Sequence, residues 1–119
     1  TNLYLDTIIA PSALNEDFFN EVNSLAPFGS GNSEPRFVIE NIKVLKSDVI
    51  AQNHIKTLLS GDDGSVFKAF AWNAKSGPLE PYLSKSNKKK INIAGRIKLN
   101  EWRGEKKVEF LIEDVSLNN

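Results

Sequence analysis

Trp102 and Arg103 are adjacent in the most basic part of the chain. Residues 85–107 hold nine basic side chains against two acids, a local balance of +7, although the whole chain has a formal net charge of zero. A sequence-tolerant single-strand site needs flat rings that stack on bases and cations that contact phosphates. The pattern therefore favours an anionic partner. The alternative is that these lysines only solvate strand edges.

Few residues could support catalysis by this chain alone. One histidine, His54, and no cysteine are too few for a zinc site or a Ser-His-Asp relay. We expect His54 to be a hydrogen-bonded residue at a turn. Asp62 and Asp63 leave an all-carboxylate Mg²⁺ site formally open, but turn chemistry explains both. We expect no catalytic residue, metal ligand or cofactor in this chain.

Length and composition indicate one globular domain. The chain has 119 residues, of which 40% are hydrophobic and 25% charged. No apolar run approaches the roughly 20 residues of a membrane helix, so we expect no membrane partner. The lack of Cys fits a reducing compartment. The lack of Met indicates a processed product or a domain of a longer protein.

Residues 90–115 read as one antiparallel hairpin. Apolar and polar residues alternate along residues 91–99, and the alternation returns along residues 108–113. Pairing Leu99 with Val108 sets apolar residues opposite each other and Lys98 opposite Glu109. This register leaves residues 102–105 at the tip of the hairpin.

Other segments predict an acidic helix and three further strands. Asn15 is a plausible N-cap, and Phe18, Phe19, Val22 and Leu25 form a helical stripe that ends before Pro27. A glycine-punctuated connector leads to a long, kinked strand over residues 37–52 and to strands over residues 55–60 and 66–72. The last strand is apolar on both faces, and we expect Trp72 in the core. A short helix is expected near residues 79–83.

This order, helix then β-β-β-α-β-β, predicts a mainly β fold: a five-stranded Greek-key OB barrel preceded by a short amphipathic helix. We place the barrel at residues 36–116, after a lead-in over residues 1–35 and before a tail of residues 117–119. An OB fold binds ligands over its second and third strands, flanked by the first and last hairpin loops. The residues expected to bind nucleic acid are therefore Trp102, Arg103, Lys106, Arg96, Lys98, Lys68, Lys56 and His54. For Trp102 the alternative is a ring folded back as a cap on the barrel rim.

Two stretches resemble a known family. LAPFGSGNSEPRF, at residues 25–37, is similar to the PFGxGNPxPxF signature of the OB domain in RecJ-type single-stranded-DNA exonucleases, with Ser33 in place of a proline. IKLNEWRGEKKVEFLIED, at residues 97–114, resembles the NEWRG segment and closing strand of that family. The connector residues that carry the resemblance are Pro27, Phe28, Gly29, Gly31, Asn32, Pro35 and Phe37.

The resemblance implies an accessory domain of a 5′–3′ exonuclease of DNA repair and recombination. In that family two-metal catalysis resides in separate DHH-type domains, whose motifs are absent here, and Mg²⁺ or Mn²⁺ would be bound there. The implied partners are single-stranded DNA, the catalytic domains of the same protein and other repair proteins. The implied location is the cytoplasm of a bacterial cell, at the nucleoid. The rival hypothesis is a protein-docking module that uses the Phe18 and Phe19 helix surface.

Overall fold

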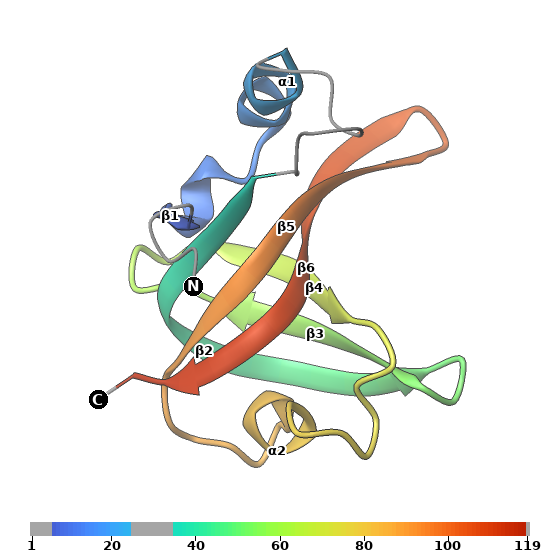
Figure 1. Ribbon diagram of the computed structural model, residues 1–119. Helices are drawn as coiled ribbons and strands as arrows, with labels where there is room; N and C mark the ends of the chain where they lie inside the picture. The colour runs from blue at the N-terminus through green and yellow to red at the C-terminus, as the bar shows by residue number, and fades with distance from the viewer. Residues whose placement is uncertain (1–5, 25–34, 119) are drawn as a thin grey trace.

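The computed structural model describes residues 6–24 and 35–118, and these form a closed β-barrel with a helix at each end (Figure 1). The strands are β1 (Asp6–Ile8), β2 (Arg36–Ile50), β3 (His54–Ser60), β4 (Val66–Ala71), β5 (Ile91–Trp102) and β6 (Glu105–Leu117). The helices are the short 3-10 turn η2 (Pro11–Ala13), α1 (Glu16–Ser24) and α2 (Glu80–Leu83).

The barrel closes because β2 pairs with two partners. The strand order is β1-β2-β3-β4-β6-β5, and β5 returns to pair with β2. All pairings are antiparallel except β1–β2 and the short β4–β6 contact. Strands β2 to β6 with α2 between β4 and β5 confirm the predicted OB barrel. The lead-in adds β1, a short parallel strand beside the start of β2.

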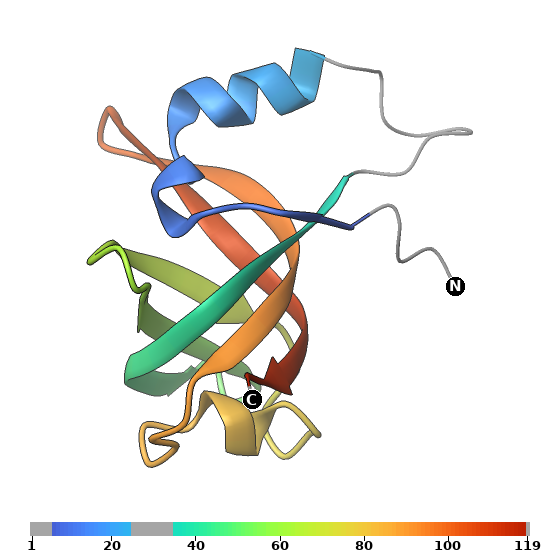
Figure 2. The same cartoon turned by 90° about the vertical axis from the view of Figure 1, so that its left-hand side faces the viewer.

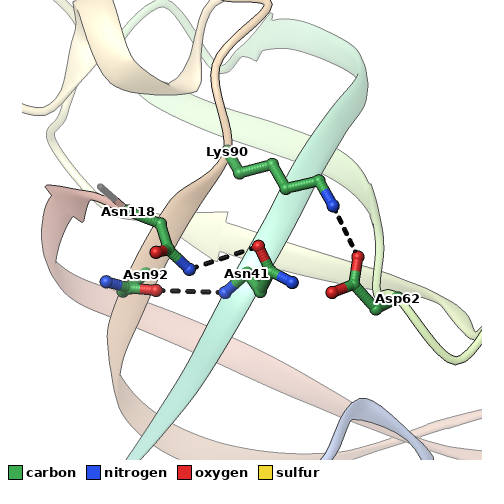
Figure 3. Close-up of polar contacts among 5 residues, drawn as sticks. All are labelled: Asn41, Asp62, Lys90, Asn92 and Asn118. Carbon is green, nitrogen blue, oxygen red and sulfur yellow. Dashed lines mark hydrogen bonds and ion pairs between the residues drawn. The ribbon is translucent and has the colours of Figure 1, made fainter.

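Strand β2 is long and bulged, as its drifting apolar pattern predicted. Its register shifts between Ile39 and Ile42 against β5, and between Val44 and Lys46 against β3. At the first shift Asn41 has a φ of 65°, which asparagine tolerates better than most residues. The Asn41 backbone N–H donates to Asn92 Oδ1 at 3.0 Å, and Asn118 Nδ2 donates to Asn41 Oδ1 at 3.2 Å (Figure 3). The bulge is therefore tied to β5 and to the residue that directly follows β6.

The β5–β6 hairpin has the predicted register. Leu99 lies opposite Val108, Ile97 opposite Phe110 and Lys98 opposite Glu109. A third register shift lies between Ala94 and Gly95, where a Cβ on Gly95 would come within 1.8 Å of the Leu111 carbonyl oxygen. Strand β6 continues to Leu117, which pairs with Ile91.

The core fills the barrel and extends under both helices. Ile39, Ile42, Ile93 and Phe110 are fully buried inside the barrel, and Leu83 of α2 is fully buried at one end. Helix α1 begins as predicted, because Asn15 Oδ1 accepts a hydrogen bond from the Phe18 N–H at 2.8 Å. Other members of the expected α1 stripe pack on the barrel: Val22 is buried and Phe18 and Phe19 are half-buried, while Leu25 and Pro27 lie outside the described residues.

Candidate nucleic-acid interface

The tip of the β5–β6 hairpin presents a tryptophan to solvent. Trp102 is 67% exposed, so the alternative that its ring caps the barrel rim is wrong. Trp102 pairs with Glu105, which leaves Arg103 and Gly104 as a two-residue turn with φ values of 51° and 80°. Both positive values are those of a type I′ turn, whose twist matches that of the strands. The Arg103 guanidinium lies 5.4 Å from the centre of the Trp102 ring.

The outer face of β3 and β4 carries three of the predicted site residues. Residues of one parity point inward on each strand: Ile55, Thr57 and Leu59 of β3 are buried, as are Phe67, Ala69 and Ala71 of β4. The other parity therefore forms the outer face, with Lys56 opposite Phe70 and Leu58 opposite Lys68. His54 stands at the first position of β3 on the same face. These positions bring His54, Lys56 and Lys68 onto one surface.

Trp72 was expected in the core, and this expectation is wrong. It directly follows β4, at a position whose side chain points to the outer face of the strand, and it is 50% exposed. Its ring stacks on Phe70, with centroids 6.2 Å apart and planes at 13°, and meets the His54 ring edge-to-face at 4.5 Å. The Asn73 backbone N–H donates to His54 Nδ1 at 2.8 Å, which confirms His54 as a hydrogen-bonded residue at a strand end. We name Phe70, Trp72 and His54 the aromatic cluster.

A groove of about 510 Å³ lies between the hairpin and the outer face of β3 and β4. The start of α1 closes one side, and Lys68, Lys106, Lys107 and Val66 are among the lining residues. In Figure 2 the orange and red hairpin projects on the same side of the barrel as the green strands β3 and β4. Lys106 Nζ lies 3.6 Å from Glu16 Oε2 of α1. The ammonium of Lys106, a candidate for phosphate contact, is therefore already paired with a carboxylate.

A second hollow continues this surface across the sheet. It is lined by Lys46 and Asp48 of β2, Lys56 and Leu58 of β3, and Lys68 of β4. Lys68 lines both hollows, so the two are contiguous. The surface therefore runs from the hairpin over β4 and β3 to β2. Its lining includes Lys46 and Lys107, which the sequence analysis did not select for the site. Phe70 and Trp72, also not selected, lie on the same outer face of β4 but line neither hollow.

Arg96 and Lys98 of β5 line neither hollow. Arg96 Nε lies 3.0 Å from Glu113 Oε2, and Arg36 Nε lies 3.6 Å from Glu113 Oε1. Arg96 is thus engaged by a carboxylate on its own sheet, while Lys98 is exposed opposite Glu109. Their role in nucleic-acid binding stays a prediction.

Most of the connector lies outside the described residues, including Pro27, Phe28, Gly29, Gly31 and Asn32. Its described end ties α1 to the barrel: Phe37 is buried, and its ring meets Phe18 edge-to-face at 5.4 Å. Pro35 is half-buried.

The two aspartates of the β3–β4 loop have structural partners. Asp63 Oδ1 accepts a hydrogen bond from the Ser65 N–H at 2.9 Å, and this bond lowers the pKa of Asp63 below its usual range. Lys90 Nζ forms an ion pair with Asp62 Oδ1 at 2.6 Å (Figure 3). Within residues 6–24 and 35–118 no cluster of three or more His, Asp or Glu side chains could hold a metal ion. Neither of the described α-helices is long and apolar enough to cross a membrane.

The closed barrel, its strand order and the helix between β4 and β5 define an OB-fold domain. The chain belongs to the RecJ OB domain family, whose model matches residues 5–114. It is 25% identical over 116 residues to the single-stranded-DNA-specific exonuclease RecJ of Bacillus subtilis (strain 168), covering 96% of this chain and 14% of that protein. The chain thus spans about one seventh of the length of this curated relative.

Solved structures share the fold. RecJ from Thermus thermophilus in complex with Mn²⁺ superposes with a TM-score of 0.66 at 23% identity, over 96% of this chain and 15% of that one. The Mg²⁺ complex of RecJ from the same organism gives a TM-score of 0.65 at 24% identity, over 92% and 16%. The fold resemblance extends through both the barrel and the N-terminal helical segment, since nearly the whole chain is covered.

Proposed function

We propose that this chain is an accessory single-stranded-DNA-binding domain of a RecJ-type exonuclease. The observation that carries the proposal is the outer surface that Lys46, Lys56, Lys68 and Lys106 line, with Trp102 exposed at the hairpin tip and Trp72 exposed after the end of β4. Lysines on this surface would contact phosphates, while Trp102 would stack on a base. Such contacts hold a strand without reading its sequence.

The curated relative supports this choice of ligand, because it is described as specific for single-stranded DNA. In the proposed arrangement, phosphodiester hydrolysis takes place in other domains of a longer protein, with Mg²⁺ or Mn²⁺ bound there. This chain would hold the incoming strand beside that catalytic centre and contribute no catalytic group. The work would be DNA repair and recombination in the bacterial cytoplasm.

The second candidate function is docking onto neighbouring domains without autonomous DNA binding. Its proposed surface was the Phe18 and Phe19 face of α1. Both rings are half-buried against the core of this chain, which leaves less of that face for a partner. The basic surface, by contrast, is open to solvent at Lys68, Lys106 and Lys107. This difference favours the DNA-binding function.

The test is the affinity of the chain for a fluorescein-labelled oligothymidylate, measured by anisotropy at low salt. Trp102→Ala should weaken binding by about 1–3 kcal/mol, the usual contribution of one stacked base. Lys106→Ala should also weaken it, whereas Lys89→Ala, on an exposed loop away from the groove, should have little effect. Equal loss in the Lys106 and Lys89 variants would mean non-specific charge attraction. An absence of binding by the unmodified chain would favour docking.

A further inference from the structure

The aromatic cluster has an arrangement that barrel packing does not require. Trp72 lies beyond the last residue of β4, and half of its surface faces solvent although it touches two other rings. The planes of Phe70 and Trp72 differ by only 13°, so the two rings present nearly parallel faces. A single exposed apolar residue is ordinary on a protein surface, but here the exposed Trp72 is grouped with two other rings and keeps half of its surface open to a planar ligand.

The cluster is held in place before any ligand arrives. His54 is fixed by the hydrogen bond from the Asn73 N–H, and its edge-to-face contact positions the Trp72 ring. Asn73 has a φ of 56°, which turns the chain sharply away directly after Trp72. An aromatic ring fixed in this way loses little conformational entropy on binding, and this favours affinity.

Charge around the cluster selects the kind of ligand. Lys56 lies directly opposite Phe70 on the neighbouring strand, and Lys46 and Lys68 line the same hollow as Lys56. Asp48 is the only acid among the residues that line this hollow. Planar faces beside three cations match bases joined by phosphates, whereas an apolar protein surface would leave the lysines without partners.

We infer that Trp72, supported by Phe70 and His54, is a second base-stacking site for single-stranded DNA, at the opposite end of β4 from the hairpin groove. Val66, at the groove, and Trp72 are six residues apart, which corresponds to about 20 Å along a strand. The DNA would therefore cross β4 and β3 between two aromatic contacts, Trp102 and Trp72, with lysines between them. This inference rests on the proposed function and extends it.

The experiment uses the two tryptophans as separate reporters. Trp102→Phe leaves Trp72 as the fluorophore, and Trp72→Phe leaves Trp102. Each variant is titrated at low salt with an oligothymidylate and with an abasic strand of the same length, which keeps the phosphates but has no bases. We expect oligothymidylate to quench both reporters, and the abasic strand to quench Trp72 much less.

Affinity measurements complete the test. Trp72→Ala should weaken oligothymidylate binding about 5- to 100-fold, as expected for one lost stacking contact, and Trp72→Phe should retain most of the affinity. Ile8→Ala, at a similarly exposed apolar residue of β1, is the matched control and should not change it. Circular dichroism and thermal melting of each variant show that the barrel is intact.

Two outcomes separate this inference from the proposed function. If oligothymidylate quenches the Trp102 reporter but leaves both the Trp72 reporter and the Trp72→Ala affinity unchanged, the inference is wrong and the hairpin site stands. The aromatic cluster would then belong to a protein contact. If neither reporter responds and the unmodified chain does not bind, the proposed function itself fails.

Discussion

At the scale of single residues, Arg103 combines local strain with a functional position. It occupies the first position of a type I′ turn with a φ of 51°, where asparagine, aspartate or glycine is usual. A residue other than glycine in this region costs of order 1–3 kcal/mol and persists where something else requires it. Here the side chain lies against Trp102 at the tip of the proposed DNA site. This position accounts for an arginine in an unfavourable conformation.

Arg103→Asn should therefore separate stability from binding. The free energy of unfolding should rise by about 0.5–1 kcal/mol, because Asn-Gly is the preferred type I′ pair. Affinity for oligothymidylate should fall, because a phosphate contact is lost. Urea unfolding and anisotropy measure the two effects, with Lys89→Asn as a control for charge. A variant that binds as tightly as the unmodified chain would show that Arg103 has no part in the site.

The two tryptophans show what a single residue's sequence context can predict. Trp102 was correctly placed at the hairpin tip, because alternation and the Lys98–Glu109 pairing fixed the register around it. Trp72 was wrongly placed, because β4 is apolar on both faces. Two of the inward-facing side chains of β4 are alanines, and the reason is visible only in the barrel. Ala69 lies opposite Phe110, whose buried ring fills the interior. A tryptophan on β4 is therefore accommodated outside.

At the scale of elements, the bulge at Gly95 shapes the β5–β6 hairpin. Gly95→Ala should destabilise the chain by roughly 2–4 kcal/mol, since its Cβ would overlap the Leu111 carbonyl oxygen on the partner strand. Gly64→Ala is the matched control: its φ of 85° makes alanine unfavourable, but open space surrounds it. That substitution should cost about 1 kcal/mol. Equal losses in urea unfolding would show that the bulge is not a tight contact.

The contact between α1 and the hairpin couples the acidic helix to the DNA site. Glu16→Gln should raise affinity for oligothymidylate about two- to threefold at low salt, because Lys106 would no longer be shared with a carboxylate. Thermal stability should change little, since the pair is exposed and such pairs contribute at most about 1 kcal/mol. Glu21→Gln, on the same helix but outside the groove, is the control. Weaker binding by Glu16→Gln would mean that the glutamate positions Lys106 for DNA.

Elements were predictable where the signal was local. The Asn15 cap, the short helix near residues 79–83 and the kink of β2 all followed from residue patterns. The placement of α1 against Lys106, and the groove between them, did not. Both depend on contacts between segments about 90 residues apart, and periodicity carries no information about such contacts.

At the scale of the whole molecule, charge is distributed unevenly over a chain whose net charge is zero. Residues 1–35 carry five acids and no Lys or Arg. Five lysines, in contrast, line a surface that crosses β2, β3 and β4 and reaches the hairpin: Lys46, Lys56, Lys68, Lys106 and Lys107. Affinity for single-stranded DNA should therefore fall steeply with salt. Each phosphate contact adds about −0.7 to the slope of log K against log salt, so three to five contacts predict a slope of roughly −2 to −4. A slope near zero would exclude phosphate contacts as the basis of binding.

The OB topology was predicted from the order of strands and helix, together with the family resemblance. The pairings that close the barrel, β2 with β5 and β4 with β6, are remote in sequence and were inferred from the fold, not from the residues. The short strand β1 was only a weak signal, because three residues are too few to establish a period. Closure nevertheless matters for function, since it brings the hairpin over the outer face of β3 and β4.

The most direct test of the DNA-binding surface is a ¹H–¹⁵N chemical-shift titration of this 119-residue chain with a short oligothymidylate. The largest shifts should cluster at residues 54–56, 68–72 and 102–107, and include the indole N–H signals of Trp72 and Trp102. A matched duplex should produce smaller shifts. No shifts at low salt, or shifts confined to the outer face of α1, would contradict the account and identify the chain as a docking module.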